Sequence, residues 1–457
     1  MGKVKKVWAL VPDGTGIKNY LYSKIFRDDE IELTLFHNFD ADTLRQIQQH
    51  VSIKESVEIP AYKESIKEKF LRELIHRCRL WYNSEKLQNP TIKTFWKSNH
   101  KSWKLKLFYG SVVFASKFIG SYGKMLKLEE KYQKSLRKNT FYEKVKEILK
   151  SQEPDLVFCT HQRALKAPTV FAAATDLGIK TSTVIYSWDN LPKARLALQS
   201  DDYYVWSEHM KLELRLFYKE ISEEKIKITG TPQFEFYYGN DHIIEKKEFY
   251  SSYGLDSNKT LICFSGDDEL TSPYDPHYLN DLAEAITNSG WENKYTIVFR
   301  RCPVDVSGRY DWVVEKYKDL IVEMPPLWNF NSKKWTAVYP TFDDVKLLVS
   351  LAFYADLVVN VGSTMAFDFG MFNKPCVYIN YDHVPDPKWS VDIIYKYPHF
   401  RSMPHENTVY WFDSKENISG VLDTALNSGG NQIKKWFQII VAPHKIASEE
   451  IQKLLKA

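Results

Sequence analysis

Short apolar runs alternate along this chain with longer amphipathic segments. The runs are typical of parallel strands that are buried on both faces, and the segments between them have helical periodicity. Strands are predicted at 7–11, 31–36, 154–159, 180–186, 202–206, 225–229, 259–264, 295–299, 320–324, 357–361 and 376–379. Helices are predicted over 141–151, 166–177 and 343–354. Two more helices are predicted to begin near 17 and 208, and another to end near 288. This alternation predicts an α/β protein with parallel sheets joined by right-handed crossovers.

The length of 457 residues exceeds one ordinary core and predicts more than one domain. We expect an N-terminal Rossmann-like domain over 1–240, with a helical insertion at 61–150. A second Rossmann-like domain is expected over 241–430, followed by a helical tail at 431–457 that crosses back to the first domain. Ligands of doubly wound sheets bind at the carboxyl ends of the strands, so the two domains are expected to face a cleft.

The chain lacks the long apolar run of a transmembrane helix, and its five cysteines are scattered without a Cys-x-x-Cys pair. Reduced core thiols in a cytoplasmic protein are the simplest interpretation. No spacing of ligands predicts a metal or cofactor site.

The expected insertion is strongly basic. Residues 61–150 contain 22 Lys or Arg and 8 Asp or Glu, which is +14 in a chain whose net charge is +4. Tryptophan and tyrosine interleaved with lysine suit an anionic membrane surface, although solvated helices with aromatic residues in the core would show the same composition. Nucleic acid is the least favoured of these partners.

The segment 356–381 is the most informative part of the sequence. It reads as a buried strand, a turn of Gly362, Ser363 and Thr364, a helix, and a second strand. Backbone N–H groups at such a helix start can bind an anion, and Asp368 lies one helical turn further on. This arrangement suits a diphosphate followed by a ribose, although an ordinary βαβ unit would also explain it.

This segment resembles the donor-binding segment of GT-B-fold glycosyltransferases from bacterial surface-polysaccharide and lipopolysaccharide assembly. The resemblance extends in patches over 13–20, 154–163, 186–190, 205–236 and 341–382. It implies a metal-independent transferase whose substrate is a nucleotide sugar and which needs no cofactor. It also implies that Gly362, Ser363 and Thr364 contact the donor phosphates. Asp368, where the family usually has Glu, is implied to bind the ribose.

Further donor-binding candidates follow two strands of the second domain. Arg300 and Arg301 precede Cys302, where related enzymes often have Arg-x-His-Pro, so either arginine is expected to compensate for the missing histidine on phosphate. Ser265 and Gly266 resemble the loop under the donor nucleotide. A surface arginine pair and a plain turn remain alternatives. Asp343 and Asp344 are expected to cap a helix and to stabilise its dipole.

Transfer to an acceptor hydroxyl group usually needs a base. In order of preference, the candidates are Asp13, Asp189 and His161, which all follow predicted strands of the first domain. Their neighbours are candidates for acceptor binding: the backbone at two glycines, a tryptophan that can stack on a sugar, and an asparagine. These residues are Gly14, Gly16, Trp188 and Asn190.

The preferred hypothesis is a cytoplasmic glycosyltransferase, peripheral to the inner membrane, that acts on a glycan or lipid-linked acceptor. A nucleotide-sugar 2-epimerase shares the architecture but needs no acceptor surface. A GT-B-like protein without catalysis, which recognises glycans or phosphates, is the third hypothesis. Conversion of a donor without acceptor favours the second, and binding without turnover favours the third.

Overall fold

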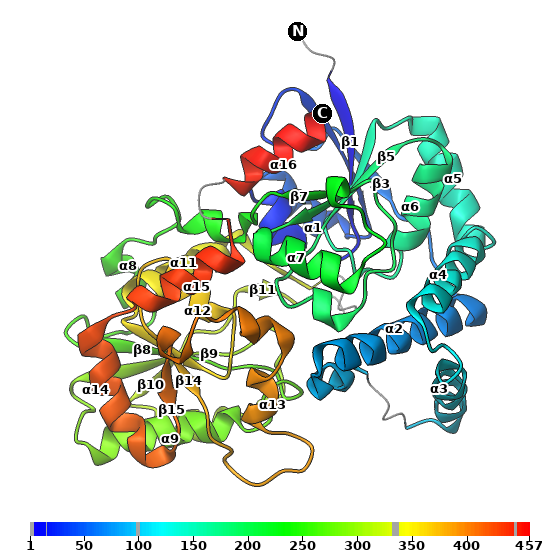
Figure 1. The fold of residues 1–457 in the computed structure, drawn as a ribbon. Coiled ribbons are helices and arrows are strands. Elements are labelled where there is room, and N and C mark those ends of the chain that lie inside the picture. Colours follow the sequence, from blue (N-terminus) through cyan, green and yellow to red (C-terminus); the bar gives the residue numbers. More distant parts are fainter. Residues whose placement is uncertain (1–3, 15, 97–100, 331–337, 443–445) are drawn as a thin grey trace. The chain divides into compact units, whose positions relative to one another are not determined.

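The computed structural model describes residues 4–14, 16–96, 101–330, 338–442 and 446–457. The chain forms two compact units, each built on its own parallel sheet (Figure 1). Unit 1 comprises Met1–Pro232, Phe330–Tyr339 and Ile440–Ala457. Unit 2 comprises Gln233–Asn329 and Pro340–Ile439.

Unit 1 contains a seven-stranded sheet in the order β3-β2-β1-β4-β5-β6-β7, with parallel pairing throughout. The order reverses at the boundary between β1 and β4, which is the position where doubly wound sheets bind ligands. The central strands are buried on both faces, as their apolar runs predict. The strands are β1 (Lys5–Val11), β2 (Ile31–His37), β3 (Glu55–Glu58), β4 (Leu156–Cys159), β5 (Lys180–Val184), β6 (Asp202–Val205) and β7 (Ile226–Ile228).

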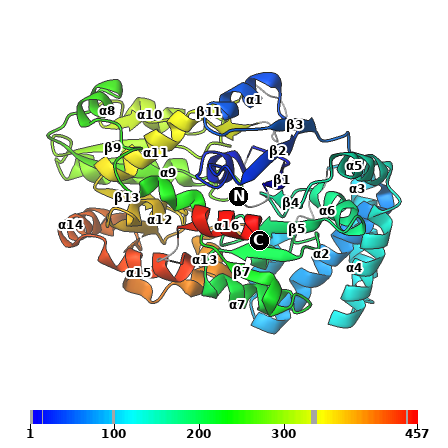
Figure 2. The same ribbon diagram turned by 90° about the horizontal axis from the view of Figure 1, so that it is seen from above.

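The basic segment of unit 1 is helical, and three of its helices form a group beside the sheet (Figures 1 and 2). Helix α2 (Ile66–Leu87) packs on both α3 (Trp103–Ser116) and α4 (Tyr122–Leu136). A capping box of Ser65 and Glu68 starts α2. The other helices of this unit are η1 (Ile17–Leu21), α1 (Ala41–Gln48), η2 (Pro90–Phe95), α5 (Thr140–Gln152), α6 (Ala167–Asp176), η3 (Leu191–Lys193), α7 (Glu208–Phe217) and η4 (Glu223–Lys225).

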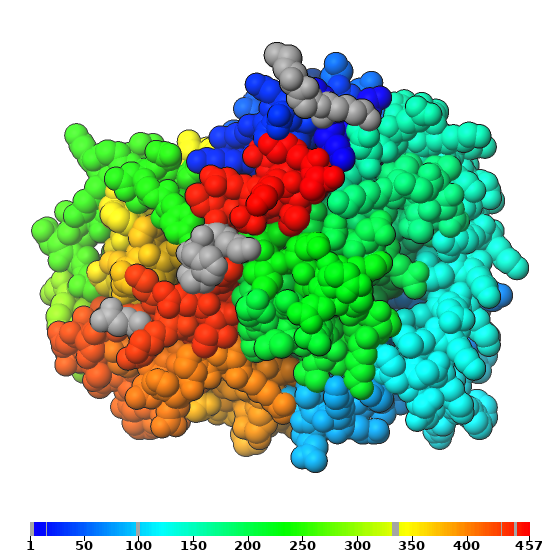
Figure 3. Space-filling view, turned by 45° about the horizontal axis from the view of Figure 1, so that its top comes forward, coloured from blue at the N-terminus to red at the C-terminus, as the bar shows by residue number. Residues whose placement is uncertain are grey.

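The last helix of the chain, α16 (Ala447–Lys456), packs on the first segment of unit 1. Lys456 Nζ lies 2.7 Å from a carboxylate oxygen of Asp28 and 2.9 Å from one of Glu30. Figure 3 shows this helix in red against the blue N-terminal residues. The two ends of the chain therefore stabilise the same unit.

Unit 2 contains a six-stranded sheet in the order β10-β9-β8-β13-β14-β15, again with parallel pairing. Its order reverses between β8 and β13. The strands are β8 (Thr260–Ser265), β9 (Tyr295–Arg300), β10 (Ile321–Glu323), β13 (Leu357–Asn360), β14 (Cys376–Ile379) and β15 (Tyr410–Phe412). The α-helices are α8 (Lys246–Ser252), α9 (Asp275–Asn288), α10 (Asp311–Lys316), α11 (Phe342–Tyr354), α12 (Met365–Gly370), α13 (Val391–Tyr395), α14 (Ile418–Ser428) and α15 (Asn431–Ile440).

The predicted fold class is confirmed, because the chain contains two doubly wound parallel sheets. The sequence did not predict the edge strands β3 and β15. Strand β3 has the sequence ESVE and is mostly exposed, so it lacks the apolar run by which the inner strands were identified. Among the described residues, no helix is both long and apolar enough to cross a membrane.

Candidate active site

Asp13 and His161 form a polar pair in unit 1. They follow β1 and β4, which are neighbours at the point where the strand order reverses. His161 Nδ1 lies 2.7 Å from Asp13 Oδ2, and both side chains are partly buried. An ionised carboxylate can only accept, so the pair places the imidazole proton on Nδ1 and leaves the lone pair on Nε2. In that tautomer Nε2 could accept a proton, and Asp13 would hold the ring in position.

Asp189, the other candidate base, is engaged by its own turn. Its carboxylate forms an ion pair with Lys193 and accepts a hydrogen bond from Asn190 Nδ2 at 2.8 Å. Asn190 in turn accepts from Gln162 Nε2 at 3.0 Å, and Gln162 Oε1 accepts from Tyr186 N at 3.0 Å. The buried amide of Gln162 thus ties the loop after β4 to the segment after β5, next to His161.

Three residues that were expected to contact an acceptor lie against other parts of unit 1. Trp188 is only 3% exposed, so its ring lies in the core and offers no face to a sugar. A Cβ atom on Gly14 would lie 2.1 Å from Val338 O, and one on Gly16 would lie 2.3 Å from Thr160 Oγ1. A side chain at either glycine would therefore collide with the chain itself.

The expected donor turn of unit 2 follows β13. Gly362 has φ +70°, and a Cβ atom there would lie 2.7 Å from Phe400 Cζ, which explains the glycine. Ser363 N donates to Asn360 Oδ1 at 2.7 Å, so this N–H group is already bonded. Helix α12 has only six residues; the Thr364 side chain does not cap it, but Met365 N donates to Ser363 Oγ at 3.4 Å. Fewer N–H groups than predicted are therefore available to bind an anion at this turn, although Ser363 and Thr364 are partly exposed.

Asp368 does not lie open to solvent behind this turn. Its residue is 3% exposed, and its Oδ1 accepts from Tyr237 Oη at 2.6 Å. Burial and then the carboxylate raise the pKa of Tyr237 well above its usual value, so the tyrosine remains the donor. Asp368 therefore holds the segment that enters unit 2. Tyr237 was not predicted as a partner, because a tyrosine in an aromatic stretch is typical of a buried core.

The two arginines after β9 have different surroundings. Arg300 is buried, and its Nη2 lies 2.9 Å from Asp344 Oδ1. Asp344 also accepts from Leu327 N and Trp328 Nε1, at 2.7 and 2.9 Å. Arg301 is partly exposed, and no hydrogen bond or ion pair joins its guanidinium to the described parts of the chain. Of the two arginines, Arg301 is thus the one whose guanidinium group can bind an added anion.

The remaining residues named for unit 2 have partners within that unit. The helix-capping residue of α11 is Thr341, which accepts from Asp344 N at 3.2 Å, and the Asp344 carboxylate pairs with Arg300 instead. Ser265 is buried, and a Cβ atom on Gly266 would lie 2.5 Å from Tyr310 Oη. Gly266 therefore accommodates a core tyrosine. Cys302, which replaces the expected histidine, is a thiol whose pKa burial raises to about 12.

No three histidine, cysteine or carboxylate side chains of the described residues come together as a metal site.

Comparison with known proteins adds a family match within unit 1. Residues 73–232 match the family model described as monogalactosyldiacylglycerol (MGDG) synthase. A sequence comparison with curated proteins found no match.

Solved structures with similar folds include UDP-GlcNAc 2-epimerases from two organisms. The Methanocaldococcus jannaschii enzyme has 13% identity and a TM-score of 0.51, over 95% of this chain and 98% of its own. The Neisseria meningitidis enzyme bound to UDP-GlcNAc has 10% identity and a TM-score of 0.50, over 99% and 100%. S. aureus MnaA with UDP has 12% identity and a TM-score of 0.52, over 97% and 94%. At such identities the likeness concerns the fold, which is that of a GT-B-like protein with two Rossmann-like sheets.

Proposed function

We propose that this protein is a glycosyltransferase that moves a sugar from a nucleotide-sugar donor to a glycan or lipid-linked acceptor. The observation that carries the proposal is the Asp13–His161 pair at the reversal point of the unit 1 sheet. The match of residues 73–232 to a glycolipid synthase family supports the same reaction class. Assembly of a cell-surface polysaccharide or lipopolysaccharide at the inner leaflet is the setting we propose.

In this proposal the acceptor hydroxyl oxygen forms the bond to the anomeric carbon of the donor sugar. His161 Nε2 takes the hydroxyl proton, and Asp13 orients the imidazole and stabilises its charged form. The bond from the anomeric carbon to the diphosphate breaks, and the nucleoside diphosphate leaves with the electron pair. Arg301 would meet the charge that grows on the diphosphate, so the proposal needs no metal.

The surface of α3 supports an acceptor at a membrane. Trp103 is 69% exposed and Phe114 is 63% exposed, with Leu107 and Phe118 similarly uncovered. Lysines 101, 104, 106 and 117 are exposed beside them. Apolar rings with basic neighbours suit the headgroup region of an anionic bilayer, where both can be satisfied. We therefore propose that α3 holds unit 1 at the inner leaflet, close to a lipid-linked acceptor.

A nucleotide-sugar 2-epimerase is the second candidate, since solved epimerases share the fold. An epimerase changes its donor without any acceptor, whereas a transferase changes it in proportion to acceptor. A protein that only binds would change nothing.

The donor is tested first by thermal shift with UDP, CMP, CDP, GDP and ADP. One nucleotide at 100 times its Kd should stabilise the folded protein by about 2.7 kcal/mol. The Arg301→Gln variant should lose most of this shift, and Arg27→Gln, which removes an exposed charge from unit 1, should keep it. Asp368→Ala tests the ribose role that the resemblance implied. No shift with any nucleotide would contradict the proposed donor class.

A further inference from the structure

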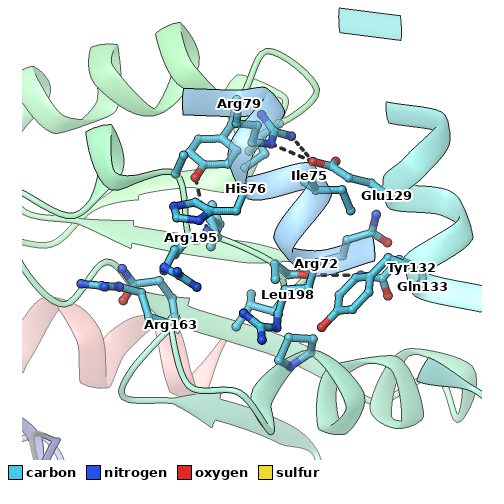
Figure 4. Close-up of a pocket in the computed structure, with 18 of the residues that line it drawn as sticks. Arg72, Ile75, His76, Arg79, Glu129, Tyr132, Gln133, Arg163, Arg195 and Leu198 are labelled. Atoms are coloured by element: carbon cyan, nitrogen blue, oxygen red, sulfur yellow. Dashed lines mark hydrogen bonds and ion pairs between the residues drawn. The ribbon is translucent and has the colours of Figure 1, made fainter. Parts of the chain in front are cut away.

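A cavity of about 90 Å³ lies inside unit 1, between α2, α4 and the loops after β4 and η3 (Figure 4). It has room for several water molecules or for a small polar ligand. Four arginines line it, together with one histidine and two glutamates. These residues are Arg72, Arg79, Arg163, Arg195, His76, Glu129 and Glu220.

Two of the arginines are fully engaged by carboxylates. Arg72 binds both oxygens of Glu64, at 2.7 and 3.0 Å, and Glu73 at 2.6 Å. Arg79 forms ion pairs with Glu129 and Glu220. Their donors are directed at the protein, so this side of the cavity is close to neutral.

The other two arginines leave positive charge uncompensated. Arg195 Nη1 is 3.7 Å from Glu73, which Arg72 already shares. Within the described ranges, no carboxylate or hydrogen-bond acceptor is paired with Arg163. Burial lowers the pKa of Arg195, Glu73 opposes this, and Arg72 and Arg163 lower it further. Cations gathered in this way favour the binding of an anion.

His76 places a second requirement on any ligand of this cavity. It is 3% exposed, and its Nε2 lies 3.0 Å from Lys193 O, so Nε2 carries the proton and donates. Its Nδ1 is buried and has no hydrogen-bond partner in the described chain. Burial, and then Arg195, lower the pKa of His76 to about 3, so the ring is neutral. A buried lone pair calls for a hydrogen-bond donor.

Figure 4 shows His76, Arg195 and Arg163 next to one another at the same side of the cavity. A ligand for this place needs an oxyanion for the guanidinium groups and a neighbouring hydroxyl group for His76. We propose that the cavity binds a phosphorylated polyol or sugar, with Arg163 and Arg195 on the phosphate and His76 Nδ1 accepting from the hydroxyl. Arg163 is two residues from His161, so under the proposed function this ligand is part of the acceptor; the binding itself does not depend on that function.

Isothermal titration of the full chain with glycerol 3-phosphate, inorganic phosphate and glycerol tests the proposal. Glycerol 3-phosphate should bind most tightly, and glycerol should not bind measurably. Arg163→Gln and Arg195→Gln should each weaken the binding of glycerol 3-phosphate at least tenfold, whereas the matched control Arg27→Gln should not. His76→Phe should remove the preference for glycerol 3-phosphate over phosphate while phosphate still binds.

Vesicles distinguish a free ligand from a lipid headgroup. The ligand is the lipid form if the protein binds phosphatidylglycerol vesicles, if the arginine variants weaken that binding, and if free glycerol 3-phosphate does not bind. The proposal is overturned if neither form binds the wild type, or if Arg27→Gln weakens binding as much as Arg163→Gln. His161→Ala should leave this binding intact while transfer is lost, so failure of the proposed reaction is seen separately.

Discussion

Replacing Asp13 by asparagine tests the proposed base through its partner. The carboxylate is 2.7 Å from His161 Nδ1, and an amide of the same shape has no charge with which to stabilise an imidazolium. A hydrogen bond to a charged group contributes about 1.5–3 kcal/mol. At 1.36 kcal/mol for each factor of ten, Asp13→Asn should lower kcat by roughly 10- to 150-fold. His161→Ala removes the base itself and should lower kcat by about 10²- to 10⁴-fold.

The two changes should not add. If Asp13 acts only through His161, the double variant should have the kcat of His161→Ala within a factor of about two, because the partner is already lost. Initial rates of nucleotide release with saturating donor and acceptor give each kcat. Asp189→Asn is the matched control, since that carboxylate is paired with Lys193 and should change kcat little. Additive losses from Asp13 and His161, or a larger loss from Asp189→Asn, would refute the assignment.

Three further predictions concern other parts of the chain. Arg300→Gln should cost about 3–5 kcal/mol of unfolding free energy in a denaturant titration, because it leaves Asp344 buried without its cation, whereas Arg301→Gln should cost little. Replacing Trp103 and Phe114 by serine should lower partition to anionic vesicles at least tenfold in a sedimentation assay, because each ring would lose burial in the headgroup region. Burial lowers the pKa of His37 to about 4, so the folded state opposes protonation of this ring. The free energy of unfolding is therefore fully present above pH 6.5 and falls by at most about 3 kcal/mol as the pH drops toward 4. His37→Asn should flatten this pH dependence in urea titrations.

Each of these has a result that would contradict it. Equal stability of Arg300→Gln and wild type would mean that the ion pair contributes nothing. For the membrane, Leu212→Ser is the control, since Leu212 is exposed on α7 of the same unit, and an equal loss would show that α3 is not special. For His37, Nδ1 accepts from Phe39 N at 2.9 Å, and an asparagine oxygen can replace it. An unchanged pH profile in His37→Asn would place the titrating group elsewhere.

The inner strands were predictable because each is a continuous apolar run bounded by turn residues. Strand β13 and the glycine turn after it came from such a run, and its position beside β8 follows the usual doubly wound order. Strand β3 was missed because an edge strand need not be apolar on either face. Helix α12 ends at Gly370, although the hydrophobic periodicity of the sequence continues past this glycine into a turn.

The candidate site was predictable only in part. Residues after strands could be named from sequence, and two of them, Asp13 and His161, lie together because β1 and β4 are neighbours. The burial of individual side chains could not be predicted from the sequence. Trp188 and Asp368 were expected to contact a ligand, but both are buried in the protein. The partners of Arg300 and of Tyr237 are more than 40 residues away in sequence, so no local pattern distinguished Arg300 from Arg301.

Acceptor-dependent sugar transfer tests the central claim most directly. The nucleotide that stabilises the protein selects a panel of radiolabelled donors, which are incubated with vesicles that carry membrane lipid extract. The account predicts label in the lipid or glycan fraction, proportional to acceptor and lost in His161→Ala. Donor converted to its epimer without acceptor would contradict it in favour of an epimerase, and donor that binds but is never changed would contradict it in favour of a binding protein.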